Sequence, residues 1–151
     1  IIAVVIVHLI YGKNHADMVP MLAMYAGLGA VLGHNYPFYM KFKGGKGIAV
    51  TAGMIASTTN IWMILICIAV FAGMVAITRY VSVGSLVVVT VYMIEVIVYG
   101  QMGGYGVEAG YLHEMYGIAV FLVISAFFKH RANIRRLLNG TENKLSVGKE
   151  S

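Results

Sequence analysis

Lysines and glycines gather in one short polar stretch, residues 33–47. The stretch carries Lys41, Lys43 and Lys46, and it ends in Gly44-Gly45-Lys46-Gly47 immediately before an apolar run. If that run is a helix, its N-terminus presents unpaired backbone N–H groups, the glycines allow a close approach, and the lysines add positive charge. The pattern therefore favours a site for phosphate or another small anion. The alternative is a membrane-surface loop whose lysines meet anionic lipid headgroups.

This stretch does not have the pattern of a nucleotide-binding P-loop. That motif needs a hydroxyl residue directly after its lysine, whereas Lys46 is followed by Gly47. Met40 stands where the first glycine of the motif belongs. We therefore do not expect hydrolysis of nucleoside triphosphates.

Two further polar clusters follow along the chain. Arg79 lies between two apolar runs, and Ser82 lies at the start of the second. Arg79 is either a phosphate ligand or an anchor of a turn at the membrane surface. His130 and Asn133 are three residues apart, so in a helix their side chains lie on the same face. The arginines near them are typical of the basic flank that ends a membrane helix. A paired histidine and asparagine beside the membrane indicates a polar site.

The composition is that of an integral membrane protein. Hydrophobic residues make up 60% of the 151 residues and charged residues only 11%, whereas soluble chains carry about 25% charged residues. In so apolar a chain, the net charge of +5 is expected on the cytoplasmic side of a membrane rather than against nucleic acid. A single cysteine excludes a disulfide framework, and no spacing of His, Cys, Asp and Glu indicates a metal site.

The apolar runs predict an all-α bundle of membrane helices. A membrane span takes about 20 residues. Runs of that length lie at residues 61–78 and 80–99, and shorter ones at residues 20–33 and 115–128. We expect residues 1–11 to be the end of a helix that begins upstream.

Residues 47–57 decide the topology. This run of 11 residues rises only about 16 Å as a helix, so it is half a span, and we expect it to form a hairpin with residues 61–78. The hairpin puts Lys46, Arg79 and the basic C-terminal tail on one side, which the positive-inside rule makes cytoplasmic. Residues 139–151 form a polar cytoplasmic tail that is expected to fray.

Two residues inside the apolar runs could do chemistry but are interpreted as packing residues. Glu95 lies near the end of a span, and an intramembrane carboxylate is a functional candidate. Its distance from the basic face favours a packing or snorkelling role. Cys67 lies in an apolar run, where a free thiol behaves as a small hydrophobic residue.

The order of the polar clusters resembles that of the acyl-phosphate-dependent glycerol-3-phosphate acyltransferases, the PlsY family. The second motif of that family resembles Gly33, His34 and Pro37, then Phe42-Lys43-Gly44-Gly45-Lys46-Gly47, then Thr51. Its third conserved region resembles residues 79–82 together with His130, Arg131, Asn133, Ile134, Arg136, Leu137, Gly140 and Glu142. The resemblance covers nearly the whole chain, but no residues here match the family's first motif, a cytoplasmic loop between its first two helices.

The resemblance implies a fold and a reaction. The chain would hold the last five of seven transmembrane helices, one of them a half-span, in one acyltransferase domain over residues 1–151. The enzyme would move a fatty acyl group from an acyl phosphate to the sn-1 hydroxyl of glycerol 3-phosphate, giving lysophosphatidate and inorganic phosphate. It would lie in the bacterial inner membrane with its active face and C-terminus in the cytoplasm. We expect it to bind both substrates and membrane lipid as a monomer, without nucleic acid or a cofactor.

The resemblance also implies residue roles. The substrate-binding residues would be His34, Lys43, Gly44, Gly45, Lys46, Gly47 and Thr51. The catalytic residues would be Arg79, Ser82, His130 and Asn133, with Glu142 as structural support. An acyl phosphate is already activated, so no covalent nucleophile is required. The proton of the attacking hydroxyl goes to His130, to His34 or to a substrate phosphate, and the sequence leaves these alternatives open.

Other glycerol-phosphate acyltransferases use acyl-CoA or acyl carrier protein and carry His-x-x-x-x-Asp. No histidine of this chain is followed five residues later by Asp, which favours the acyl-phosphate donor. The alternatives are a small anion transporter or channel subunit, which would use the same basic face and half-span helix, and an inactive fragment. The sequence contains no internal repeat and confines its polar clusters to one face, so the transporter is the less favoured interpretation.

Overall fold

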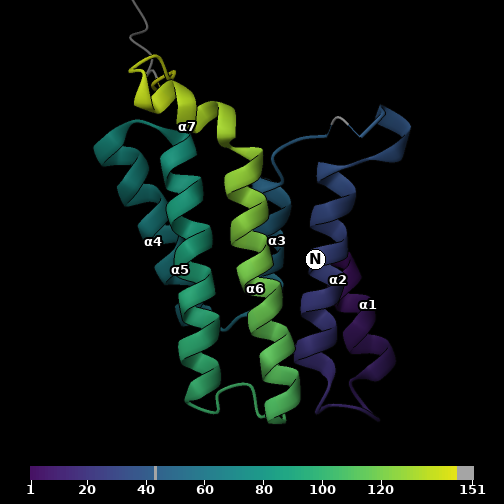
Figure 1. Ribbon diagram of the computed structural model, residues 1–151. Helices are drawn as coiled ribbons and strands as arrows, with labels where there is room; N and C mark the ends of the chain where they lie inside the picture. The colour runs from purple at the N-terminus through teal and green to yellow at the C-terminus, as the bar shows by residue number, and fades with distance from the viewer. Residues whose placement is uncertain (43, 146–151) are drawn as a thin grey trace, which may run out of the picture.

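Helices of unequal length stand side by side in this protein, seen as a computed structural model that describes residues 1–42 and 44–145 (Figure 1). In chain order they are α1 (Ile2–Tyr11), α2 (Val19–Asn35), the 3₁₀ helix η1 (Phe38–Met40), α3 (Ile48–Thr58), α4 (Ile61–Thr78), α5 (Val81–Gln101), α6 (Ala109–Lys129) and α7 (Arg131–Leu138). No strand occurs in these described ranges. The all-α prediction is confirmed.

Three of the described helices, α4, α5 and α6, are long and apolar enough to cross a membrane. The helix α6 starts at Ala109, six residues before the apolar run predicted at 115–128. A helix satisfies its own backbone hydrogen bonds, so it can continue through polar residues such as His113 and Glu114 beyond the hydrocarbon region. The fold is that of an integral membrane bundle.

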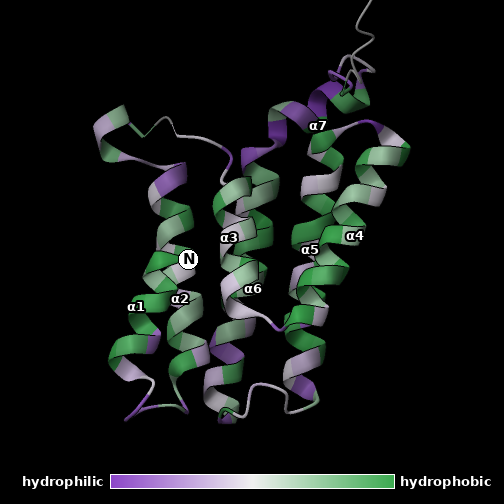
Figure 2. Cartoon of the chain, turned by 180° about the vertical axis from the view of Figure 1, so that it is seen from behind, coloured by the Kyte–Doolittle hydropathy of each residue, from purple (hydrophilic) through white to green (hydrophobic). Residues whose placement is uncertain are grey.

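The half-span hairpin is confirmed. Helix α3 ends at Thr58, and α4 begins at Ile61 after a turn in which the Asn60 side chain accepts a hydrogen bond from the Met63 N–H at 3.1 Å. Figures 1 and 2 place this turn inside the height of the bundle, well away from the loop between α5 and α6. The chain therefore returns to the end of the bundle from which α3 started.

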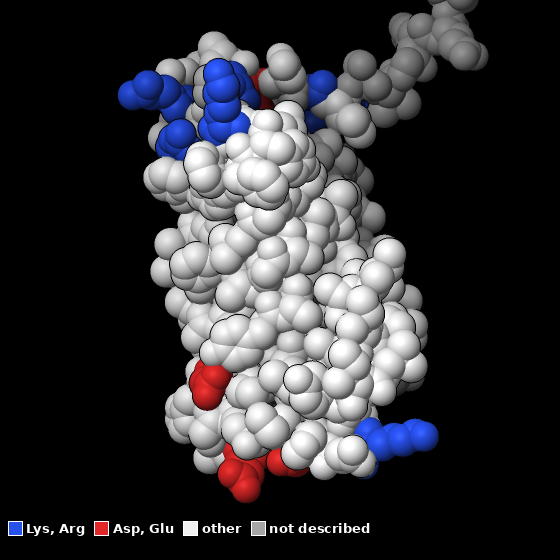
Figure 3. All heavy atoms as spheres, turned by 90° about the vertical axis from the view of Figure 1, so that its right-hand side faces the viewer, with Lys and Arg blue, Asp and Glu red and all other residues white. Residues whose placement is uncertain are grey.

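Charge separates along the long axis of the bundle, as the hairpin predicts. Lysine and arginine side chains gather mainly at the end that carries α7, and acidic side chains mainly toward the opposite end (Figure 3). Between these ends the ribbon in Figure 2 is mostly green, so the residues there are mostly hydrophobic, as expected for the part of a bundle that lies in a membrane. Such a division is what the positive-inside rule describes.

The core lies along α6, which packs between α2 and α5 (Figure 1). Met24, Val89, Tyr92, Val96 and Met115 are among its fully enclosed side chains. The surfaces of α1 and α4 that point away from this core are apolar and exposed, as expected for helices against lipid. These contacts set the spacing of the helix ends that carry the polar clusters.

The expectation that the tail frays from residue 139 is wrong for residues 139–145, and residues 146–151 lie outside the described residues. The Thr141 N–H donates to the Arg136 carbonyl at 2.8 Å, and the Leu145 N–H donates to the Arg79 carbonyl at 2.7 Å. This part of the tail is therefore fastened across α7 to the turn between α4 and α5. A polar composition does not prevent order where backbone groups find partners.

Candidate active site

A loop of residues 44–47, the glycine loop, packs against the end of α2. A Cβ atom at Gly44 would collide with the His34 carbonyl, and one at Gly45 would lie 2.5 Å from His34 Nε2. At Gly47 the backbone has φ +77°, and a Cβ atom would meet the Asn35 side chain. Larger residues would push the loop off α2, so these glycines fit the loop for steric reasons.

The glycine loop leads directly into the N-terminus of α3. Gly47 is the N-cap, and no side chain caps the first turn. The unpaired N–H groups of that turn and the helix dipole favour an anion here. Lys46 is exposed beside it. Lys43, the other lysine predicted for this site, lies outside the described residues.

Sequence reasoning missed two residues beside the glycine loop, Asn35, which packs against Gly47, and Lys129, which contacts Asn35. Asn35 is 1% exposed, and its Oδ1 has no hydrogen-bond partner within the described part of the chain. The Lys129 Nζ donates to the Asn35 carbonyl at 2.5 Å and lies 3.9 Å from the centroid of the Tyr36 ring. Lys129 therefore ties the end of α6 to the end of α2. The sequence signal was the position of Asn35 directly after His34 in the motif.

Glu142 joins three elements in what we call the Glu142 cluster, formed with Ser82, Asn133 and Arg136. Its Oε1 accepts hydrogen bonds from Ser82 Oγ at 3.0 Å and Asn133 Nδ2 at 2.6 Å. Its Oε2 accepts one from Arg136 Nε at 2.7 Å. The hydrogen bond from Asn133, followed by those from Arg136 and Ser82, holds the pKa of Glu142 below its usual range. The carboxylate is therefore ionised at neutral pH.

His130 lies at the junction of α6 and α7 and is 1% exposed. Its Nδ1 lies 2.8 Å from the Ala126 carbonyl, which can only accept, so Nδ1 carries the proton. Burial lowers the pKa of His130 and nearby Lys46 lowers it further, against the opposing effects of the Ala126 carbonyl and Glu142. The ring is neutral at pH 7, with an unprotonated Nε2.

Arg79 lies at the same end of the bundle but contributes differently from the other predicted residues. It ends α4 in a left-handed conformation with φ +61°, and its side chain is exposed. In the part of the chain that the structure describes, its guanidinium makes no hydrogen bond to the Glu142 cluster. Its backbone carbonyl fixes the tail through Leu145.

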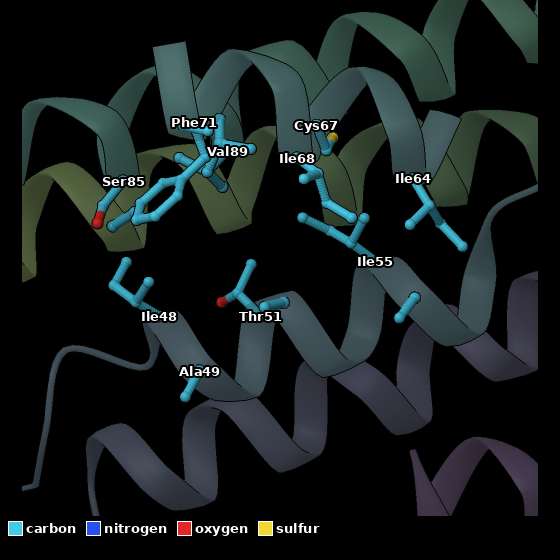
Figure 4. Close-up of a pocket in the computed structure, with 15 residues that line it drawn as sticks. Ile48, Ala49, Thr51, Ile55, Ile64, Cys67, Ile68, Phe71, Ser85 and Val89 are labelled. Carbon is cyan, nitrogen blue, oxygen red and sulfur yellow. The ribbon is translucent and has the colours of Figure 1, made fainter. Parts of the chain in front are cut away.

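An apolar groove runs from this polar end into the bundle. Its volume is about 580 Å³, and it lies between α3 and α4, with α5 and α6 behind it. Thr51 is 8% exposed and projects from α3 into the groove between Ile48 and Ile55 (Figure 4). Thr51 therefore belongs to the groove wall rather than to the glycine loop.

The glycine loop, Ser82 and His130 each lie within four residues of a residue that lines the groove. Ile48 follows Gly47, Ser85 is three residues after Ser82, and Ala126 is four residues before His130. Three or four residues make one turn of a helix, so the polar side chains lie about one turn beyond the lining. The arrangement can hold a small anion and a hydroxyl at the mouth of a channel for hydrocarbon. No group of three His, Cys, Asp or Glu side chains in residues 1–42 and 44–145 is placed to hold a metal ion.

Bundle and site together define a polytopic membrane protein with a basic, polar face at one end of an apolar groove. A family model, described as glycerol-3-phosphate acyltransferase, matches residues 1–140. The chain belongs to this family. It is 44% identical over 131 residues to the glycerol-3-phosphate acyltransferase of Halalkalibacterium halodurans, covering 83% of this chain and 58% of that protein. It is 42% identical over 120 residues to that of Clostridioides difficile, covering 80% of this chain and 53% of that protein.

The fold matches two solved structures of PlsY (YgiH), an integral membrane glycerol 3-phosphate acyltransferase. The glycerol 3-phosphate form has a TM-score of 0.66 at 26% identity and covers 96% of this chain and 78% of that chain. The lysophosphatidic acid form has a TM-score of 0.65 at 26% identity and covers 96% and 80%. The resemblance read from the motifs is therefore confirmed, while the chain spans little more than half the length of the curated relatives named above.

Proposed function

We propose that the protein transfers a fatty acyl group from an acyl phosphate to the sn-1 hydroxyl of glycerol 3-phosphate. The observation that carries this proposal is the position of the buried His130 and the glycine loop at the polar mouth of an apolar groove. An acyltransferase needs this pairing, because one substrate is a small polar phosphate and the other carries a long hydrocarbon tail. The solved glycerol 3-phosphate and lysophosphatidic acid forms of PlsY support this choice of substrate and product.

The phosphate of glycerol 3-phosphate would bind at the glycine loop. The N-terminus of α3 offers backbone N–H donors, the exposed Lys46 adds positive charge, and we expect Lys43 to add more. His34 lies against Gly45 and would shape the far wall of this site. Arg79, exposed on the same face, would attract the negatively charged substrates to the mouth of the groove.

The neutral His130 would orient the attacking hydroxyl. Its unprotonated Nε2 can accept a hydrogen bond from the hydroxyl, because Nδ1 is engaged by Ala126. The hydroxyl oxygen forms a bond to the acyl carbonyl carbon, the bond from that carbon to the phosphate oxygen breaks, and inorganic phosphate leaves. The hydroxyl proton passes to a phosphate oxygen of a substrate, so no protein base is needed. Holding both groups in place is the main source of rate acceleration.

Asn133, Ser82 and Glu142 would keep this arrangement rigid. Asn133 and Ser82 both donate to Glu142, so α5 and α7 share one ionised partner in the tail. The hydrocarbon tail of the donor would lie in the groove beneath them, against Thr51 and its apolar neighbours. The charge asymmetry of Figure 3 supports a cytoplasmic active face in the bacterial inner membrane. We propose a monomer as the working state.

The test uses residues 1–151 together with any residues that precede them in the natural protein, purified in detergent or mesophase. With palmitoyl phosphate and glycerol 3-phosphate, we expect lysophosphatidate and inorganic phosphate in equal amounts. Lys46→Ala should raise the KM for glycerol 3-phosphate by about tenfold, since one charge-assisted contact is lost. Lys13→Ala, at the opposite end of the bundle, is the matched control and should change nothing.

Two results would contradict the proposal. One is product formed from palmitoyl-CoA but not from palmitoyl phosphate, which would replace the donor. The other is no product from a well-folded protein with either donor. Phosphate flux into liposomes containing the protein would then support the transporter alternative.

A further inference from the structure

One end of the groove, which we call the deep end, lies beside the turn between α3 and α4, so the half-length of α3 sets how far the groove extends. Helix α3 ends at Thr58, and the chain turns back into α4 at Ile61. The deepest lining residues come from both arms of this hairpin, Ile55 and Ala56 from α3 and Ile64 and Cys67 from α4. In Figure 4, Ile64 and Cys67 lie at the opposite end of the groove from Ser85 and Ile48.

Polar groups lie directly behind this deep end. Cys67 Sγ donates to Glu95 Oε2 at 3.2 Å, and Thr58 Oγ1 lies 3.0 Å from the Tyr92 hydroxyl. Glu95 Oε1 is buried and has no hydrogen-bond partner within the described part of the chain. A methylene group pushed past Cys67 would have to separate the thiol from the carboxylate and lie against an unpaired oxygen. Both changes cost free energy, because a buried polar group loses its partner or is covered by hydrocarbon.

We propose that this deep end selects the length of the donor's acyl chain, with Cys67 as the residue that the chain terminus meets and Glu95 as the polar barrier behind it. The inference rests on the proposed function, because it requires an acyl chain in the groove. It adds a specificity determinant to that site. Chains that stop at Cys67 fill the groove, and longer chains must bend out toward lipid.

A long acyl chain can leave the groove sideways, so we expect a graded preference for chain length and not a sharp cut-off. Ala52 and Ala56 line the groove and are exposed, so the groove is open along one side of α3. A chain that leaves by this opening gives up its contacts with Ile64 and Cys67. In a membrane, where lipid is as apolar as the groove, close packing rather than transfer from water decides between chain lengths.

The experiment measures kcat/KM for saturated acyl phosphates of increasing length, using the protein with all its natural residues. Cys67→Phe fills the deep end and should lower the ratio of long-chain to short-chain kcat/KM by about tenfold or more, as expected for overpacking. Ala56→Leu narrows the same place from α3 without touching the Cys67–Glu95 hydrogen bond. It should shift the ratio in the same direction. Ile66→Phe is the matched control, because Ile66 is 49% exposed, neighbours Cys67 and does not line the groove.

The outcomes separate the inference from the function on which it rests. A shift toward shorter chains in Ala56→Leu and Cys67→Phe, with the profile of Ile66→Phe unchanged, supports the inference. If Cys67→Phe does not fold, Ala56→Leu decides alone. Product from every chain length, with a profile that Ala56→Leu leaves unmoved, overturns the inference and leaves the acyltransferase proposal intact. No product from any acyl phosphate overturns both.

Discussion

Two carboxylates, Glu142 and Glu95, lie beyond opposite ends of the groove lining, and their hydrogen-bond partners differ greatly. Glu142 is 7% exposed, and its two oxygens accept three hydrogen bonds, from Ser82, Asn133 and Arg136. Glu95 accepts one from the Cys67 thiol, a weak donor, and its second oxygen is unpartnered among the described residues. Glu142 therefore joins parts of the fold through hydrogen bonds, whereas Glu95 is a polar group that hinders a hydrocarbon chain from extending past Cys67.

This contrast shows that the hydrogen-bond partners of a carboxylate decide whether it stabilises a membrane protein. At the polar end, an ionised group joins elements that are far apart in sequence, because several donors share the cost of removing it from water. At the deep end, the same residue type with one poor partner contributes little to stability and instead makes its surroundings unfavourable for hydrocarbon. Substitutions at both ends of the groove test this contrast, and they are given in order of decreasing expected effect.

Glu142→Gln should have the largest effect. An amide nitrogen cannot accept the hydrogen bond from Arg136, and the charge that strengthens the bonds from Ser82 and Asn133 is lost. We expect a decrease of about 2–3 kcal/mol in the free energy of unfolding, measured by SDS titration in mixed micelles. Glu108→Gln, at an exposed position near the opposite end, is the control. Equal stability of the two variants would contradict a structural role for Glu142.

Gly47→Ala should disturb the glycine loop. A left-handed conformation costs alanine about 1–2 kcal/mol, and the added Cβ atom would meet Asn35. We expect a comparable loss of stability and a higher KM for glycerol 3-phosphate, since the N-terminus of α3 would shift. Gly29→Ala is a suitable control for KM, because beyond its chain neighbours and the backbone of its own helix nothing lies within 4 Å of the added Cβ. An unchanged KM in Gly47→Ala would place the phosphate elsewhere.

His130 should make the protein less stable as the pH falls below 6.5. Its pKa is lowered from 6.5 in the folded state, chiefly by burial, so the unfolded chain binds more protons in this range. Stability therefore rises with pH through the interval between the folded and unfolded pKa values, by at most about 1.4 kcal/mol per pH unit. Unfolding of the natural protein and of His130→Gln, compared from pH 5 to 8, measures this. Parallel curves would show that His130 is not buried as a neutral ring.

Glu95→Gln should have the smallest effect. The amide oxygen can still accept from Cys67, and no strong donor is lost. We expect the free energy of unfolding to change by less than about 1 kcal/mol, in either direction. The same SDS titration applied to Glu95→Gln and Glu142→Gln gives the contrast directly. A loss at Glu95 as large as at Glu142 would mean that the deep carboxylate is also a structural centre.

Much of the fold could be predicted because membrane helices are encoded locally. The length of a membrane helix can be read from the length of its apolar run, and 11 residues are too few to cross a bilayer. The half-span hairpin follows from this count, and the hairpin in turn puts Lys46 and Arg79 on the same side. The glycine loop could also be predicted, since glycines clustered before a helix are typical of a close backbone approach. Helix ends were less predictable, as the early start of α6 at Ala109 illustrates. The backbone hydrogen bonds of a helix can continue into polar residues beyond the apolar run.

The helices, the topology, the distribution of charge and, through the motifs, the family all follow from the sequence alone. Which polar groups meet depends instead on the tertiary structure. Ser82 and Glu142 are 60 residues apart in the chain, and Asn35 and Lys129 are 94 apart. Neither contact leaves a local pattern, because each depends on how helix ends are brought together by the packing of apolar faces far from them. The groove and its polar deep end arise in the same way, from the place where α3 stops beside α4.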